Sequence, residues 1–397
     1  MNHSISVILP TYNRAGLIEE TIDSLLAQTR KPDEILVIDD GSTDGTSQVL
    51  ARYDSLRIIR TENQGKASAL NMALKMVTGD FVWIVDDDDL LLPDACMTLS
   101  RPLEADLGLG FCAGRHIDFE ISLLDGRMTT REPGYMRVSA PEQIFPDLLE
   151  GCHIFQPGLM VRRSVYEAVG PFDTTLVRSQ DYEMILRIAR RFRGLQLADT
   201  VFLHREHAGT RGTAAESFSA SENSDRWAAF NRIIFTRLLE SLPDHEMIAQ
   251  RDLALLPAAL HSRAARIKRG CVLARQRMWP EAISAWQEAS AMSPSPLSVI
   301  EREMLARSPN SAIGAPELFT CRKVRSELAS LANMPSPGPE ITSVISRSSL
   351  WYGRAAFKSR HWRRMWQVMR FQLQMRPLTA AVRQLGSKGG GLEGKAF

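Results

Sequence analysis

Short apolar runs alternate with amphipathic segments through the N-terminal part of the chain. The runs are rich in β-branched residues, which predicts strands, and the amphipathic segments have helical spacing. Strands are expected at 5–9, 35–38, 56–59 and 81–85, and helices at 17–26, from Thr43 or Asp44 onward, and at 65–76. Strands that are apolar along their whole length and separated by helices are typical of a parallel sheet covered on both faces. We therefore predict an α/β fold here.

Polar residues follow three of the predicted strands at the point where each strand ends. They are Pro10 to Asn13, Asp39 to Ser42 and Asp86 to Asp89. The carboxyl ends of parallel strands meet at one edge of a sheet, and α/β proteins bind ligands outside that edge. The pattern therefore predicts a ligand site built from three strand ends.

The four consecutive carboxylates of Asp86 to Asp89 indicate what that ligand contains. Adjacent carboxylates at the end of a buried strand repel one another unless a cation lies among them. Hard oxygen ligands suit Mg²⁺ or Mn²⁺, and such ions often keep substrate phosphates as further ligands. A helix N-cap before Pro93 would account for one Asp but not for four. We favour a metal or diphosphate site.

Length, charge and cysteine content set limits on the rest of the interpretation. A chain of 397 residues is long enough for two or three domains, and its net charge of +2 does not indicate a nucleic-acid partner. Five scattered cysteines without metal-ligand spacing are typical of free thiols in a reducing compartment. The chain has neither a signal-peptide pattern nor an apolar run of about 18 residues. We expect it in the cytoplasm, or peripherally on the inner face of the cell membrane.

The composition changes near residue 226, where Ala, Leu, Arg and Gln replace the β-branched runs and favour helices. We predict an α/β domain at 1–225, an all-helical region at 226–385 and a disordered glycine-rich tail at 386–397. Segment 263–293 resembles one helix pair of tetratricopeptide type, with a looser echo at 354–377. Because solenoids need about three repeats, we expect a helical appendage instead.

The segment 341–388 contains ten Lys or Arg residues and no Asp or Glu. Its aromatic residues are Trp351, Tyr352, Phe357, Trp362, Trp366 and Phe371. Basic amphipathic helices with aromatic residues are typical of proteins that bind a membrane surface. Alternatively, the aromatic side chains pack inward and the arginines are simply solvated. The pattern leaves both interpretations open.

Four blocks of the sequence resemble the family 2 glycosyltransferases, which have the Rossmann-like GT-A fold. The blocks are 6–14, 34–44, 86–89, and 170–173 followed by 179–183, with 65–71 similar to the family's intervening helix. The resemblance covers about residues 5 to 212. It implies an inverting enzyme that moves a sugar from a nucleotide-diphosphate sugar, most commonly a UDP-sugar, to an acceptor hydroxyl. The Gln-x-x-Arg-Trp block of processive relatives is absent, which favours transfer of a single sugar.

The resemblance also implies roles for individual residues. Asp181 matches the catalytic base, while Asp86 and Asp88 match the Asp-x-Asp motif that holds Mn²⁺ or Mg²⁺ and the diphosphate. His207 either completes the metal site or is an ordinary surface histidine. Without the resemblance, Asp181 would be interpreted as a carboxylate that complements a helix dipole.

The nucleotide is expected to rest on the first strand ends and the start of the next helix. The implied contacts are Pro10, Thr11, Tyr12, Arg14, Asp39, Asp40, Gly65, Lys66, Asp86 and Asp87. Tyr12 either stacks on the base or plugs the strand end. Lys66 does not belong to a phosphate-loop motif, because Arg60 and Ala67 stand where that motif needs Gly and Ser or Thr.

The expected acceptor is a glycan, a lipid-linked sugar or a protein, in cell-envelope or surface polysaccharide and glycoconjugate biosynthesis. The segment 209–221 is either a lid over the donor or a plain linker. A nucleotidyltransferase is disfavoured because Pro10 to Arg14 is not a glycine-rich basic loop. The remaining alternative is a degenerate GT-A domain that binds a nucleotide-sugar or a protein without catalysis.

Overall fold

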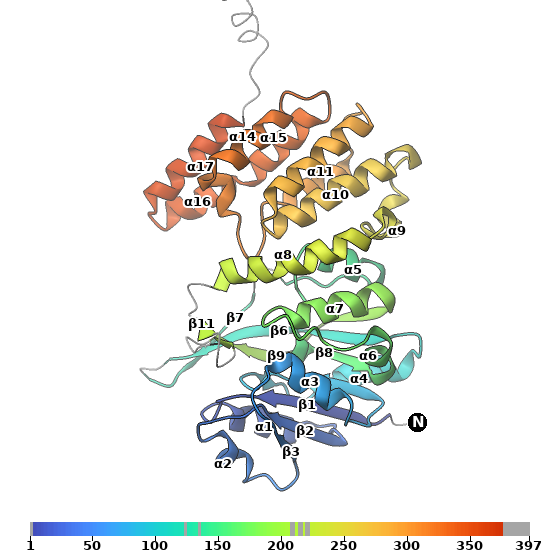
Figure 1. Ribbon diagram of the computed structural model, residues 1–397, viewed down its shortest axis with the longest axis vertical. Helices are drawn as coiled ribbons and strands as arrows, with labels where there is room; N and C mark the ends of the chain where they lie inside the picture. Colours follow the sequence, from blue (N-terminus) through green and yellow to red (C-terminus); the bar gives the residue numbers. More distant parts are fainter. Residues whose placement is uncertain are drawn as a thin grey trace, which may run out of the picture. The chain divides into compact units, whose positions relative to one another are not determined.

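A computed structural model describes residues 3–122, 125–133, 136–206, 211–212, 217–218 and 223–375. The chain divides into two compact units, Met1–Glu240 and Ser241–Phe397. The first unit is built on a large β-sheet and the second is helical (Figure 1). His207, most of the segment 209–221 and the tail 386–397 lie outside the described residues.

The first unit alternates strands and helices in the predicted order. Its strands are β1 (Ile5–Thr11), β2 (Glu34–Asp39), β3 (Arg57–Arg60), β4 (Phe81–Ile84), β5 (Leu90–Leu91), β6 (Phe111–Ile121), β7 (Met128–Arg131), β8 (Leu159–Arg162), β9 (Gly194–Arg205), β10 (Arg211–Gly212) and β11 (Ser217–Phe218). Its helices are α1 (Ile18–Leu26), α2 (Thr46–Leu50), α3 (Lys66–Leu74), α4 (Ala95–Ala105), α5 (Ile144–Leu148), α6 (Arg163–Val169), α7 (Gln180–Arg191) and α8 (Asn223–Ser241).

The main sheet has the strand order β3-β2-β1-β4-β8-β6-β9-β5, with β7 paired to the outer part of β6. The first four strands pair in parallel, as the alternation of strands and helices predicted. Beyond β4 the sheet is mixed, because β8 runs antiparallel to both β4 and β6, whereas β6 and β9 are parallel. The α/β, GT-A-like fold is therefore confirmed, and its parallel part carries the predicted strand ends.

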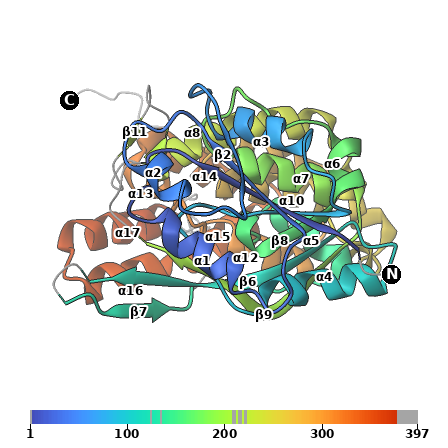
Figure 2. The ribbon, with the colours of Figure 1, turned by 90° about the horizontal axis from the view of Figure 1, so that it is seen from below.

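Helices cover both faces of this sheet. Figure 2 shows α1 and α4 on one side of the strands and α3, α6 and α7 on the other. All seven residues of β1 are buried, so neither face of this central strand contacts solvent. On the side of α1, the apolar residues Ile18, Ile22 and Leu25 join one core cluster with side chains from β1, β2 and β4. This packing fixes the strand ends on which the site is built.

The second unit consists of short helices. They are α9 (Gln250–Leu253), α10 (His261–Arg275), α11 (Trp279–Met292), α12 (Val299–Arg307), α13 (Pro316–Thr320), α14 (Arg322–Leu331), α15 (Gly338–Ser348), α16 (Leu350–Lys358) and α17 (Trp362–Gln374). The segment 263–293 forms α10 and α11, which pack against each other. Gly270 allows this close approach, since a Cβ atom there would lie 2.3 Å from the Trp286 Nε1 atom. None of the helices in the described part of the chain is both long and apolar enough to cross a bilayer.

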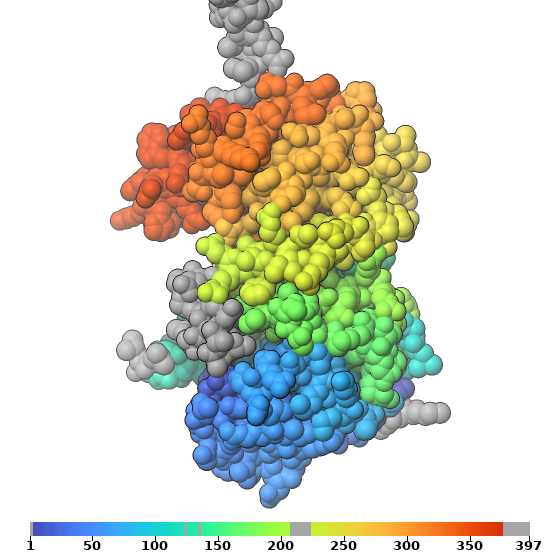
Figure 3. Space-filling view, viewed as in Figure 1, coloured from blue at the N-terminus to red at the C-terminus, as the bar shows by residue number. Residues whose placement is uncertain are grey.

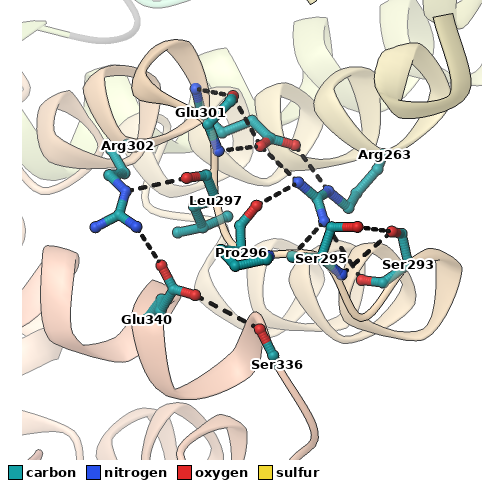
Figure 4. A network of polar contacts seen from close by, with 10 residues as sticks. Arg263, Ser293, Ser295, Pro296, Leu297, Glu301, Arg302, Ser336 and Glu340 are labelled. Carbon is teal, nitrogen blue, oxygen red and sulfur yellow. Dashed lines mark hydrogen bonds and ion pairs between the residues drawn. The ribbon is translucent and has the colours of Figure 1, made fainter. Parts of the chain in front are cut away.

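A buried ion pair connects α10 to α12 in this unit. The guanidinium of Arg263 donates two hydrogen bonds to Glu301, at 2.8 Å and 2.7 Å, and a third to the Ser295 carbonyl at 2.7 Å (Figure 4). Glu301 also accepts from the backbone N–H of Ser298, which caps α12 in return. Both charged side chains are almost fully buried, so each depends on the other for compensation.

We expect Glu301→Ala to lower the free energy of unfolding of the helical unit by about 3–5 kcal/mol, because it leaves the Arg263 charge buried without its carboxylate. Urea unfolding followed by tryptophan fluorescence measures this change. Glu327→Ala is the matched control, since Glu327 forms an exposed pair with Lys323 at 3.8 Å. That control should change stability by less than about 0.5 kcal/mol. Equal effects of the two substitutions would contradict the role of the buried pair.

Candidate functional site

A cavity of about 500 Å³ lies at the carboxyl ends of β1, β2 and β4. Most of the site residues expected from the sequence line it. They are Pro10, Thr11, Tyr12, Arg14, Asp40, Gly65, Lys66, Asp86, Asp87, Asp88 and Asp181. The strand ends therefore converge as predicted, and the start of α7 forms part of the same wall.

Asp39 is the expected nucleotide contact that does not line the cavity. Its side chain is buried, with one oxygen accepting the Ser42 N–H at 2.8 Å and the other accepting the Ser47 hydroxyl at 2.8 Å. These bonds hold the turn after β2. Asp39 therefore supports the site from behind in this structure.

Asp40, the next residue, connects β2 to the start of α3. Its carboxylate accepts the backbone N–H groups of Gln64 at 3.0 Å and Gly65 at 2.8 Å. Gly65 has φ of 89°, a backbone conformation that favours glycine. This turn places Lys66 at the first position of α3, facing the acidic strand end.

The end of β1 is joined to the turn after β2 through Asn13, which has φ of 53°. The Asn13 side-chain oxygen accepts the Thr43 N–H at 2.7 Å, and its own N–H donates to the Ser42 hydroxyl at 3.0 Å. Asn and Asp tolerate this left-handed conformation better than most residues. Arg14, which follows, is thereby directed toward the acidic run.

Two cations partly compensate the carboxylates after β4. The Lys66 ammonium donates to Asp86, and the Arg14 guanidinium lies 3.4 Å from an Asp87 oxygen. Burial, and then the neighbouring Asp88, raise the pKa of Asp87 to about 6 in spite of Arg14. The run therefore still favours additional positive charge. An oxygen-rich set of this kind fits Mg²⁺ or Mn²⁺.

Asp181 lies in the first turn of α7, across from Lys66. Burial raises the pKa of Asp181, and the nearby Asp86 raises it further, whereas Lys66 opposes both effects. The backbone N–H of Tyr182 donates to the Asp181 carboxylate at 2.9 Å. Tyr182 itself is buried, and its ring lies 5.8 Å from that of Phe235 in α8. The packing of Tyr182 therefore holds the first turn of α7, which carries Asp181, in place.

The segment before α7 is tied to α3 by a pair of hydrogen bonds. The Asn71 side chain donates to the Phe172 carbonyl at 2.9 Å and accepts the Phe172 N–H at 2.7 Å. In Figure 3 the surface around α6 and α7 adjoins that of α3. Two sequence blocks separated by a hundred residues thus lie side by side and hold Lys66 and Asp181 on one cavity.

Several lining residues were given no individual role from the sequence, although Asn13 belongs to a predicted strand end. They are Asn13, Asn63, Ala69, Phe155, Val177, Arg178, Ser179, Gln180, His204 and Trp227. Ser179 and Gln180 could have been found, because they directly precede Asp181. Trp227 lies beyond the family resemblance, and no local pattern indicates it. The expected metal ligand His207 lies outside the described residues, whereas His204 on the same segment lines the cavity.

Comparisons with known proteins show which family the chain resembles. Residues 6–170 match the family model described as Glycosyl transferase family 2. The chain is 30% identical over 193 residues to the uncharacterized glycosyltransferase YwdF of Bacillus subtilis, covering 48% of this chain and 69% of that protein. It is 27% identical over 256 residues to an uncharacterized glycosyltransferase of Rickettsia prowazekii, covering 62% of this chain and 74% of that protein.

Among solved structures, residues 1–349 of S. aureus TarS in complex with UDP-GlcNAc share the fold. The TM-score is 0.50 at 18% sequence identity, over 88% of this chain and 91% of that one. The present chain covers 51% of the length of a longer TarS chain whose structure is also known.

We expect Asp181→Asn to leave the unliganded protein as stable as the wild type at pH 7, or more stable by up to about 4 °C in Tm. A carboxyl group whose pKa is raised by folding binds its proton more tightly in the folded state. Its ionisation therefore costs stability as the pH rises through the raised pKa. The uncharged amide avoids this cost and still accepts from the Tyr182 N–H.

Thermal unfolding of the wild type and Asp181→Asn between pH 4 and pH 8 checks this expectation. Any advantage of the variant should shrink toward the acidic end, as the Asp181 carboxyl of the folded wild type takes up its proton. Asp173→Asn is the control, because hydrogen bonds from Thr175 and Arg237 lower the pKa of Asp173 overall despite its partial burial. A variant of Asp181 that loses stability at pH 7 would mean that the carboxylate is structural.

Proposed function

Because this chain is a glycosyltransferase of family 2, we propose that it moves a single sugar from a nucleotide-diphosphate sugar to an acceptor hydroxyl with inversion. We propose a UDP-sugar as the donor. One observation carries the proposal: Asp181 lines the same cavity as the Asp86–Asp88 run, with Lys66 between them. A base and a diphosphate site on one cavity are what such a transfer requires.

Asp181 is the proposed base. In its ionised form it takes the proton of the acceptor hydroxyl while that oxygen forms a bond to the anomeric carbon. The bond from this carbon to the diphosphate oxygen breaks on the opposite face of the sugar, which inverts the configuration. Because burial and Asp86 raise the pKa of Asp181, the carboxylate is a better proton acceptor than an exposed one.

Asp86 and Asp88 are the proposed ligands of Mn²⁺ or Mg²⁺, with His207 as a further candidate. A divalent cation bound there supplies positive charge to the departing diphosphate. The support from this chain is the concentration of carboxylates at one strand end, where Asp86 contacts Lys66 and Asp87 contacts Arg14. Asp87 lies between the two proposed ligands and contacts Arg14.

The nucleotide is proposed to lie on the first two strand ends. Pro10, Thr11 and Tyr12 form the wall at the end of β1, and Asp40 faces the cavity at the end of β2. Both walls are built on the parallel strands β1 and β2, which are largely buried. The fold shared with the TarS structure, which contains UDP-GlcNAc, is consistent with a UDP-linked donor.

For the helical unit we propose contact with an anionic membrane surface, in keeping with a role in cell-envelope glycan synthesis. Tyr352 and Phe371 pack inward, but Phe357, Trp362, Trp366 and Leu373 are each more than half exposed. Exposed basic residues lie among them at Arg354, Lys358, Arg360, Arg363, Arg364 and Arg370. Aromatic and basic side chains on one exposed helix pair suit the headgroup region of a bilayer.

The donor site is tested by thermal-shift titrations of UDP, GDP and dTDP, each with and without Mn²⁺. A ligand at a hundred times its Kd stabilises the folded state by about 2.7 kcal/mol. We expect a metal-dependent shift for UDP that Asp88→Ala abolishes. Asp80→Ala is the control. Asp80 directly precedes β4, accepts a hydrogen bond from the Ser4 N–H and does not line the cavity. Absence of a shift with every nucleotide would contradict the donor site and favour a degenerate domain.

The membrane proposal is tested by sedimentation with vesicles of phosphatidylcholine alone or with about a third of phosphatidylglycerol. We expect binding to the anionic vesicles that falls as salt screens the basic residues. The double variant Trp362→Ser and Trp366→Ser should reduce binding about tenfold or more. Val299→Ser is the matched control, since Val299 is an exposed apolar residue on α12. Equal binding to both vesicle types, or none to either, would contradict the proposal.

A further inference from the structure

Three side chains that the proposed transfer does not use meet on one face of the strand pair β6 and β9. Asp118 and His204 are register partners in this parallel pair. His116 lies two residues before Asp118 on the same strand, so both point to the same face. The pairing shifts register between Arg115 and His116. Register shifts of this kind change the direction of nearby side chains and are common beside functional sites.

The ligand atoms of the three residues lie close together. An Asp118 oxygen is 3.0 Å from the His204 Nδ1 atom and 3.4 Å from the His116 Nε2 atom. All three ligand atoms lie within 4.8 Å of one another. Nitrogen and oxygen ligands at about 2.0–2.1 Å from a tetrahedral zinc ion are about 3.3 Å apart. The cluster therefore needs little rearrangement to hold such an ion.

The surroundings favour a metal ligand at His116. Its ring is buried, with the Phe155 ring 4.5 Å and the Phe202 ring 5.2 Å away. Asp118 beside it is a buried carboxylate. Its second oxygen lies 3.6 Å from the Arg131 guanidinium, while the first oxygen faces the two histidines.

We propose that His116, Asp118 and His204 form a second metal site, distinct from Asp86 and Asp88, that binds a divalent transition ion such as Zn²⁺ without nucleotide. Two histidines and one carboxylate are a ligand set typical of sites that keep a coordination position open. His204 and Phe155 both line the cavity, so the site adjoins it. Water or an oxygen of the substrate is the ligand expected there.

The test uses the metal-stripped full chain titrated with Co²⁺, a zinc substitute whose visible absorption reports its coordination geometry. We expect one equivalent to bind in the absence of nucleotide with a four-coordinate spectrum, and Zn²⁺ to displace it. Asp118→Asn and His204→Gln should each weaken binding by more than about tenfold, since even the loss of an outer-shell partner costs that much. Asp88→Asn is the matched control and should leave the spectrum unchanged.

A wild-type protein that binds no Co²⁺, or variants that bind as tightly as the wild type, would mean that Asp118 simply shares hydrogen bonds with two histidines. Binding that needs UDP, or that Asp88→Asn abolishes, would assign the ion to the donor site instead. Circular dichroism of each variant guards against misfolding. His204 is partly exposed, so His204→Gln remains informative if Asp118→Asn fails to fold. The measurement needs no sugar donor and is independent of the proposed transfer.

Discussion

The repulsion among the carboxylates at the end of β4 is the constraint on which the site depends. Asp86, Asp87 and Asp181 face one cavity, and Lys66 interacts electrostatically with all three. Its pKa is raised by these acids in spite of burial, so it stays charged. Without this ammonium the cavity would hold several partly buried carboxylates with fewer counter-charges, an arrangement that proteins avoid. The arrangement of Asp86, Asp87 and Asp181 therefore depends on the position of Lys66.

That position is secured by a chain of local interactions. The Asp40 carboxylate binds the N–H groups that precede α3, and Gly65 supplies the positive φ needed there. On the far side, Asn71 in α3 binds the backbone of Phe172 and fixes the segment that leads to Asp181. The short helix α3 thus connects the end of β2 to the segment that precedes α7. It therefore fixes the position of Lys66 relative to Asp181.

The parallel half of the fold could be predicted from the sequence because three of its four strands, β1, β2 and β4, are largely apolar and buried. For β1, β2 and β4, the polar residues at the strand ends then had to converge. Pairing in the mixed half could not be predicted, since the β4–β8 and β5–β9 pairs join segments far apart in the chain. Local periodicity contains no information on such long-range partners. The cluster of His116, Asp118 and His204 depends on this pairing and was missed for the same reason.

The sequence also could not show which of two adjacent aspartates, Asp39 or Asp40, lines the cavity. Asp39 and Asp40 are adjacent carboxylates, and the alternation of the strand sends them to different surroundings. Asp39 is enclosed by donors from the following turn, while Asp40 reaches the cavity. Similarity to a family aligns both residues equally well and does not distinguish them. The hydrogen-bond partners of each carboxylate make the distinction.

For the aromatic residues of α16 and α17, too, the sequence could not show which side chains are buried and which are exposed. Tyr352 donates a hydrogen bond to the Pro309 carbonyl at 2.8 Å, and Phe371 packs edge-on against Phe319, so both belong to the helical core. Trp362 and Trp366 lie on the same helix as Phe371 but remain more than half exposed. These two side chains therefore lie outside the helical core that Tyr352 and Phe371 join.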